Sequence, residues 1–210
     1  MYCVKKLRNR YHWLISFLLF LVGITMHVHR AAFNTGLVAI LTKPNDNSTV
    51  MYAPNWNEND QGVLLSAFFY GNVAFQIPAG YIASRIGGRI GLTIALGGSS
   101  AMELLVHVCV IKSKSIYALF VSRVISGVAQ AFTFPSAILM VSNWAPLNAR
   151  SRMTSFFLGG NRMGAVLGSI LAGTLSSSAL KWQSVFYTTG TFGMLYCITW
   201  IALSANHPEK

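Results

Sequence analysis

The sequence predicts an all-α protein that crosses a membrane six times, and three observations support this fold class. Hydrophobic residues make up 53% of the 210 residues and charged residues only 10%, whereas a soluble domain carries about 25% charged residues. The mean hydropathy is +0.50. The apolar residues fall into six segments of roughly 20 residues, the length of helix that crosses a bilayer. A free-standing soluble enzyme is therefore not expected.

The six predicted spans occupy most of the chain. They cover Trp13–Leu41, Gly62–Ala83, Ile90–Ile111, Ile116–Val141, Met153–Leu175 and Ser184–Leu203. The first follows a basic stretch, as in a signal peptide, but its apolar part exceeds the usual length of about 7–15 residues. We therefore expect it to be retained as the first helix of a six-helix bundle over residues 13–204, with residues 1–12 as a cytosolic N-terminal segment.

The basic residues predict the orientation of this bundle, because cytoplasmic loops are enriched in Lys and Arg. Nine lie on one side (Lys5, Lys6, Arg8, Arg10, Arg85, Arg89, Arg150, Arg152, Lys210) and four on the other (Lys43, Lys112, Lys114, Lys181). Both termini are therefore predicted to be cytosolic, and the loop of residues 42–61 lumenal or extracellular. Asn47 in this loop begins Asn-Ser-Thr, an N-glycosylation acceptor that is used only on that face. The two signals agree.

Composition and motifs argue against other classes of function. The net charge of +11 could indicate a nucleic-acid partner, but the basic residues lie mostly between the predicted spans. The bilayer is the expected partner, and nucleic acid is not. Cys3, Cys109 and Cys197 lack the spacing of a metal site or a disulfide framework. No paired acid, base or nucleophile is apparent, so we expect neither an enzyme nor a cofactor or metal site.

Arg30 is the first candidate for a ligand-binding residue, because a charged side chain in a bilayer costs at least about 2.5–3.5 kcal/mol and commonly marks a pathway or a pair. His27, Arg30 and Asn34 are spaced three and four residues apart, so they share one helix face. The alternative is that Arg30 extends to the outer surface from near the helix end.

Arg123 is the second candidate, early in the fourth span. Ser126, Gln130 and Phe134 follow it at helical spacing and continue a stripe of polar and aromatic groups. The alternative places Arg123 at the lumenal headgroups. Two arginines facing one cavity would bind an anion, since guanidinium offers paired donors to carboxylate or phosphate.

Other features of the spans bear on packing. Arg162 and Glu103 are expected to pair with each other or with parts of the protein outside this chain. Pro78 and Pro135 are expected to bend their helices. Small residues recur every four positions in the fifth span, which permits close approach of another helix: Gly160, Gly164, Gly168 and Ala172.

Several stretches resemble a known family. Residues 80–89 resemble the signature loop of the major facilitator superfamily through Gly80, Arg85, Gly87 and Arg89, although Ser84 stands where that loop usually has an acidic residue. Four further stretches resemble the anion transporters that include sialin, the vesicular glutamate transporters and the sodium-phosphate/organic-anion transporters. They are Asp60–Gly71 with Gln76–Ser84, Arg123–Pro135, Asn143–Pro146 with Arg150–Arg152, and Trp182–Tyr187. The resemblance covers essentially the whole chain and is nearest to the sodium-phosphate/organic-anion branch.

The resemblance implies a substrate cavity with an arginine on each of two helices, at the positions of Arg30 and Arg123. It adds four further candidates for the binding site: Asn34, Asn72, Gln130 and Phe134. Proton-coupled relatives carry glutamates where this chain has Ser126 and Gln130. The coupling is therefore left open between Na⁺, H⁺ and the membrane potential.

The implied function is transport of organic anions (urate, other carboxylates or phosphate) by alternating access. The chain resembles the N-terminal half of such a transporter, with residues 205–210 beginning the loop between the halves. The implied partners are a small anion and either the C-terminal half or a second copy of the chain. The alternative is a truncated chain without transport activity that acts as an interaction or regulatory membrane protein. We predict the plasma membrane rather than a lysosomal or vesicle membrane.

Overall fold

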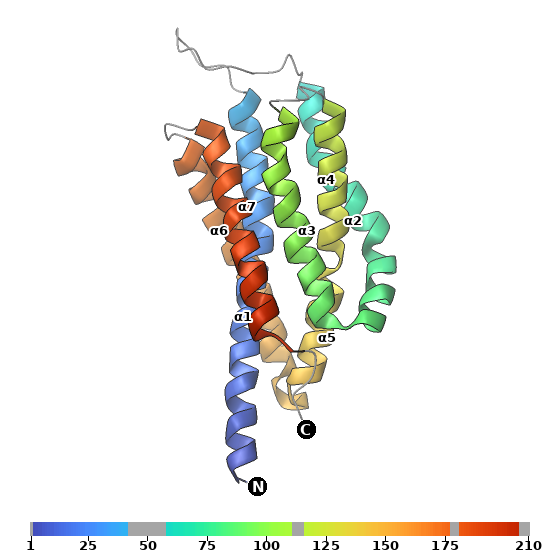
Figure 1. The fold of residues 1–210 in the computed structure, drawn as a ribbon, viewed down its shortest axis with the longest axis vertical. Helices are drawn as coiled ribbons and strands as arrows, with labels where there is room; N and C mark the ends of the chain where they lie inside the picture. Colours follow the sequence, from blue (N-terminus) through green and yellow to red (C-terminus); the bar gives the residue numbers. More distant parts are fainter. Residues whose placement is uncertain (1, 42–57, 111–115, 177–180, 206–210) are drawn as a thin grey trace.

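The computed structural model describes residues 2–41, 58–110, 116–176 and 181–205, which form a bundle of long helices (Figure 1). The predicted all-α class is confirmed: the described part of the chain contains helices and no strand. The elements are α1 (Tyr2–Leu41), α2 (Glu58–Ile86), α3 (Gly88–Val108), α4 (Ile116–Ala131), α5 (Thr133–Trp144), a 3₁₀ turn (Leu147–Ala149), α6 (Arg150–Ser176) and α7 (Lys181–Leu203). Helix α1 includes residues 2–12, so the predicted N-terminal segment continues the first helix.

Five of the six predicted spans are long and apolar enough to cross a membrane, namely those in α1, α2, α3, α4–α5 and α7. The predicted fifth span corresponds to α6, which is absent from this set. Its 27 residues give a length of about 40 Å, so it is long enough to span. Its composition differs, because Asn161 and Arg162 interrupt the apolar sequence and glycines replace larger apolar residues.

The predicted fourth span is divided into α4 and α5 near Phe132. Pro135 has no backbone N–H, so it cannot bond to the carbonyl four residues earlier. At the break, the Phe132 N–H donates to the Ala129 carbonyl oxygen (3.3 Å), and the Ser136 N–H donates to the Phe132 carbonyl oxygen (3.1 Å). Pro78 lies inside α2, which remains one helix.

The helices pack in three main pairs: α1 with α6, α2 with α4, and α3 with α7. Each pair joins one helix of the first three spans to one of the last three. The α1–α6 pair is the closest in contact, and the small-residue repeat explains it. A Cβ atom added to Gly160, Gly164 or Gly168 would lie within 3.0 Å of α1 atoms. The predicted close approach of helices at this repeat is therefore confirmed.

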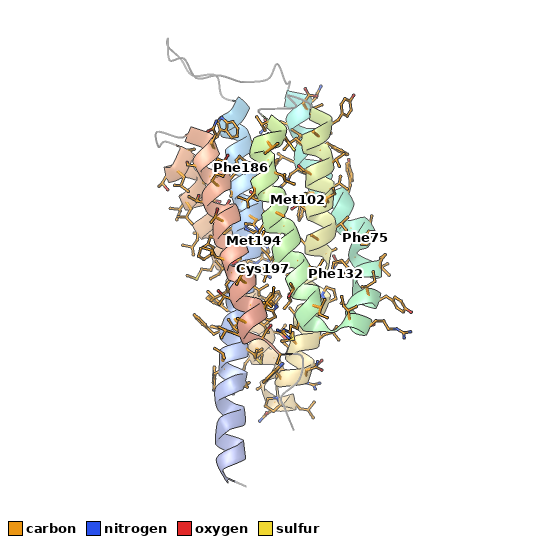
Figure 2. The ribbon with its side chains drawn as sticks, in the orientation of Figure 1. Phe75, Met102, Phe132, Phe186, Met194 and Cys197 are labelled. Carbon is orange, nitrogen blue, oxygen red and sulfur yellow. The ribbon has the colours of Figure 1, made fainter. Side chains whose placement is uncertain are left out.

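The core lies along these helix pairs. Figure 2 labels Phe186, Met194 and Cys197 on α7, beside Met102 of α3. Phe186 and Cys197 are buried, and the Cys197 thiol lies 3.8 Å from the Thr93 carbonyl oxygen. Cys197 therefore packs as a small core residue, as its position in an apolar span predicts.

Helix α1 begins, and α7 ends, at the same end of the bundle (Figure 1). A chain that crosses a bilayer an even number of times has its first and last spans end on the same side. Which side of a membrane that end faces stays a prediction from the basic residues. Asn47, most of the loop over residues 42–61, and residues 206–210 lie outside the described residues.

Candidate functional site

Arg30 projects from α1 toward α2 and α4 and is half-buried. Its guanidinium carbon lies 4.4 Å from the centre of the Phe68 ring and 5.8 Å from that of Phe69. Its Nη2 atom donates a long hydrogen bond of 3.5 Å to Oε1 of Gln130. Its Nε atom is buried without a hydrogen-bond partner among the described residues. Arg30 therefore keeps donor capacity that no described group takes up.

Arg123 lies deeper, with 3% of its surface exposed. Its guanidinium carbon is 3.4 Å from the centre of the Phe33 ring, which allows a cation–π interaction. Its Nη1 atom donates to Oε2 of Glu103 at 3.3 Å, forming an ion pair with a carboxylate that is fully buried. This corrects the expectation for Glu103: its partner is Arg123 on α4, whereas Arg162 is exposed on α6.

The two predicted arginines therefore belong to one cluster, with Phe68 between them. The Phe68 ring centre is 4.4 Å from the Arg30 guanidinium carbon and 5.8 Å from that of Arg123. The described ionic groups of this cluster are two guanidinium groups and one carboxylate, so its formal charge is +1. Because Glu103 neutralises Arg123, Arg30 carries the charge that is left without a counter-ion. An anion is the ligand that such a centre favours.

The remaining predicted binding residues lie around this cluster in different settings. Asn72 donates from Nδ2 to the Gly127 carbonyl oxygen at 3.3 Å, and so links α2 to α4 one turn before Gln130. Asn34 is exposed one turn after Arg30. Phe134 is 49% exposed, just beyond the α4–α5 break. The structure thus joins Arg30 directly to Gln130. Among the described residues it gives no hydrogen bond, ion pair or ring contact between this pair and Asn34 or Phe134.

The residues of the signature loop form the tight turn between α2 and α3. Gly87 has φ of 91°, a left-handed conformation that favours glycine. Arg85 lies over the Tyr81 ring, with its guanidinium carbon 5.3 Å from the ring centre. Arg89 donates to the Ile201 carbonyl oxygen and so ties the turn to the end of α7. Gly80 lies in α2 opposite Pro135, the nearest side chain to a Cβ added there.

Sequence reasoning missed the role of Glu103 and the aromatic surroundings of the arginines. Glu103 is the only acidic residue in the six predicted spans, and a buried arginine requires a counter-ion. These two facts together could have identified the pair. Phe33 follows Arg30 by three residues, but Phe68 comes from another helix, and only the fold brings it between the arginines.

Two histidines of α1, His27 and His29, lie in different surroundings. The Nε2 atom of the buried His29 lies 3.2 Å from the Thr189 carbonyl oxygen on α7. His27 is half-buried, and its Nδ1 atom has no hydrogen-bond partner among the described residues. No group of three metal-binding side chains occurs in the part of the chain that the structure describes.

These features define a multi-pass membrane protein with a buried cationic centre between helices. The chain belongs to the major facilitator superfamily, because the sequence model of that family matches residues 12–210. It is 34% identical to human sialin over 74% of this chain and 31% of sialin. It is also 34% identical to bovine vesicular glutamate transporter 2 over 74% of this chain and 26% of that protein. The identity to a probable small intestine urate exporter of the mouse is 30%, over 90% of this chain and 40% of the exporter.

These relatives confirm the resemblance to the anion-transporter family. The chain spans about a third of the length of these curated relatives. A solved structure with the same fold is that of a bacterial homologue of the human lysosomal transporter Spinster, in an inward-facing, unoccupied conformation. The TM-score is 0.77 at 16% identity, over 95% of this chain and 44% of that one. This likeness shows that the bundle shares the fold of part of that protein.

Proposed function

We propose that this chain forms the N-terminal half of a transporter that carries organic anions across a membrane by alternating access. The observation that supports this function most directly is the cationic cluster. Arg30 and Arg123 approach one Phe68 ring from two helices, and only Arg123 has a carboxylate partner among the described residues.

The composition of the cluster favours an organic anion over a bare inorganic one. The rings of Phe33, Phe68 and Phe69 lie against the guanidinium groups. Planar carboxylate groups match the paired donors of guanidinium, and the rings provide apolar contact for a carbon skeleton. Carboxylates, and urate as another planar organic anion, are therefore the first substrates to test, and phosphate is the next. The relatives named for urate and glutamate support this choice.

Residues that surround Arg30 support a proposal about what drives transport. Gln130, which bonds to Arg30, stands where proton-coupled relatives are expected to have a glutamate. A glutamine side chain does not ionise, so it cannot carry a proton across. We therefore propose that the membrane potential drives the anion, with Na⁺ as the alternative coupling ion. A plasma-membrane location is part of the same proposal.

The exposed face of α2 supports a partner for this half. Tyr70, Val73, Ile77 and Tyr81 are between 62% and 85% exposed and follow one another at helical spacing. Transporters of this fold place their substrate site between two such halves. We propose that either a C-terminal half or a second copy of this chain covers this face, and lipid covers the outer helices.

Uptake measurements in vesicles test this function. The 210-residue chain is reconstituted, and uptake of labelled urate is measured with and without an imposed membrane potential. We expect saturable uptake that Arg30→Ala reduces at least tenfold. Arg162→Ala is the matched control, because this arginine is exposed on α6 and makes no contact with the cluster.

The outcomes separate the two readings of the chain. Saturable uptake that depends on Arg30 means that two copies assemble into a transporter. Absence of uptake from the correctly inserted chain, with uptake restored by co-expression of a C-terminal half, means that this bundle acts only within a longer protein. Absence of uptake in both settings contradicts the proposed function and favours a regulatory or interaction role.

A further inference from the structure

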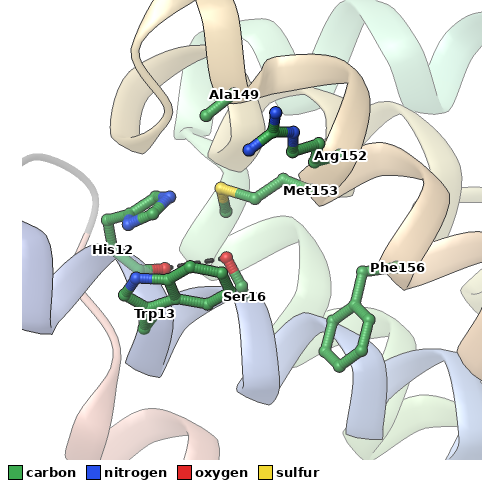
Figure 3. Close-up of a pocket in the computed structure, with 7 residues that line it drawn as sticks. All are labelled: His12, Trp13, Ser16, Ala149, Arg152, Met153 and Phe156. Atoms are coloured by element: carbon green, nitrogen blue, oxygen red, sulfur yellow. Dashed lines mark hydrogen bonds between the residues drawn. The ribbon is translucent and has the colours of Figure 1, made fainter.

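A largely apolar cavity lies between α1 and α6, at the end of the bundle where α1 begins. Its volume is about 210 Å³. Figure 3 shows the side chains that line it: His12, Trp13, Ser16, Ala149, Arg152, Met153 and Phe156. Most of the wall is therefore apolar, and Arg152 contributes a permanent charge. The cavity is separate from the cluster around Arg30 and shares no residue with it.

The cavity follows from a change in side-chain size along the α1–α6 contact. Toward the middle of the bundle, Gly160 and Gly164 let the two helices touch. Nearer the start of α6, the larger Met153 and Phe156 stand on this side of the helix and line the cavity. Phe156 lines the cavity, and its ring stacks on that of Phe20 with the ring centres 4.4 Å apart. The cavity between the two helices is thus part of the fold.

The position of the cavity places it at the surface of a membrane. The part of α1 that is long and apolar enough to cross a membrane begins at His12, which lines the cavity. Trp13 is 68% exposed, and its ring lies edge-on to the His12 ring with centres 5.2 Å apart. Tryptophan is enriched at the level of the lipid headgroups. The apolar cavity therefore opens at the level where lipid headgroups and acyl chains meet.

Arg152 is available to a ligand, in contrast to the arginines around it. Arg150 donates to the Ser142 carbonyl oxygen at 2.9 Å, Arg89 donates to the Ile201 carbonyl oxygen, and Arg85 lies over Tyr81. The exposed Arg152 makes no hydrogen bond, ion pair or ring contact with any residue that the structure describes. Its donors are thus free to bind a group in the cavity mouth.

We propose that this cavity binds an anionic phospholipid of the leaflet at this end of the bundle. The lipid phosphate would bind the Arg152 guanidinium, and the glycerol and upper acyl chain would pack against Trp13, Met153 and Phe156. A lipid fits both the charge and the apolar wall of the cavity. Basic pockets between membrane helices bind anionic headgroups, and the apolar wall can contact the acyl chain. Free phosphate would leave the apolar wall uncovered. This inference is independent of transport.

Native mass spectrometry of the purified 210-residue chain tests the proposal. The protein is offered phosphatidylserine and phosphatidylcholine in equal amounts. We expect preferential retention of phosphatidylserine. Arg152→Gln should reduce the apparent affinity for phosphatidylserine about tenfold, because it removes a charged hydrogen bond to the lipid phosphate. Arg85→Gln is the matched control: it removes the same charge at the same end, outside the cavity, and should change the affinity less than about twofold.

A second variant tests the apolar part of the site. Ala149→Phe fills the cavity but leaves Arg152 unchanged, and it should also lower phosphatidylserine retention severalfold. Equal losses in Arg152→Gln and Arg85→Gln would mean attraction to a basic surface and would overturn the site. Equal retention of the two lipids would overturn the anionic preference. Displacement of phosphatidylserine by inorganic phosphate alone would identify a phosphate site and likewise overturn the lipid assignment.

Discussion

The ion pair between Glu103 and Arg123 gives a quantitative prediction about stability. Glu103→Gln keeps the size of the side chain but leaves the Arg123 guanidinium, which is 3% exposed, without its counter-charge. At the observed separation of 3.3 Å, the Coulomb attraction is roughly 5 kcal/mol for an effective dielectric constant near 20. Removal of one partner of a buried pair costs about 3–5 kcal/mol. For a chain of this size, such a loss lowers the unfolding temperature by about 6–20 °C.

The assay is thermal unfolding of the purified chain in detergent, for the wild type, Glu103→Gln, Arg123→Gln and the double variant. We expect each single variant to be less stable than the wild type. The double variant should be more stable than Glu103→Gln, because two neutral amides can bond to each other and no isolated charge stays buried.

The comparison of the four proteins shows whether Glu103 and Arg123 stabilise the fold as an ion pair or independently of each other. If the stability losses of the single variants add up in the double variant, the two side chains are not coupled. That result would refute the ion pair and the formal charge of +1 assigned to the cluster. Urate uptake by the folded variants then shows whether the charge balance also affects transport.

Three further predictions concern packing, coupling and orientation. Gly164→Leu should lower the free energy of unfolding by at least about 1–3 kcal/mol, because its Cβ would overlap Ile24 of α1. Gly173→Leu is the control, since no atom of the described residues lies within 4 Å of a Cβ there. Equal unfolding temperatures of the Gly164→Leu variant and the wild type would contradict the close contact. Gln130→Glu should make anion uptake depend more on a proton gradient, because it places an ionisable group beside Arg30; uptake that does not respond to pH would count against this account of coupling. Asn47→Gln should remove a glycan, seen as faster migration in electrophoresis; unchanged migration of a wild-type chain after glycosidase treatment would contradict the predicted lumenal or extracellular loop.

Much of the fold could be predicted from the sequence because membrane spans have a simple physical signature. Long apolar segments identify α1, α2, α3, the α4–α5 pair and α7, and the glycine spacing of α6 predicts its contact with another helix. The break between α4 and α5 could only be expected as a bend, since Pro78 in α2 has the same chemistry and does not divide its helix.

The candidate site was harder to predict, because its contacts join distant parts of the chain. Helical spacing places Gln130 on the face of Arg123, but its hydrogen bond is to Arg30 on another helix. Similarly, Glu103 and Arg162 are the obvious opposite charges by elimination, whereas the packing of α3 against α4 gives Glu103 to Arg123. Spacing within one helix specifies a face, and only the arrangement of helices specifies which faces meet.

The pairing of early helices with late ones has a consequence for biosynthesis. Helix α1 ends at Leu41, but its main partner α6 begins at Arg150, so α1 waits roughly 5–20 s for α6 at ordinary rates of translation. During that interval its glycine-facing surface and Arg30 lack their final contacts. A charged side chain is costly in lipid, so the growing chain needs an insertion machinery that shelters α1 until the last spans are made. Early termination of synthesis would accordingly leave a segment that membrane quality control can recognise by its unpaired arginine.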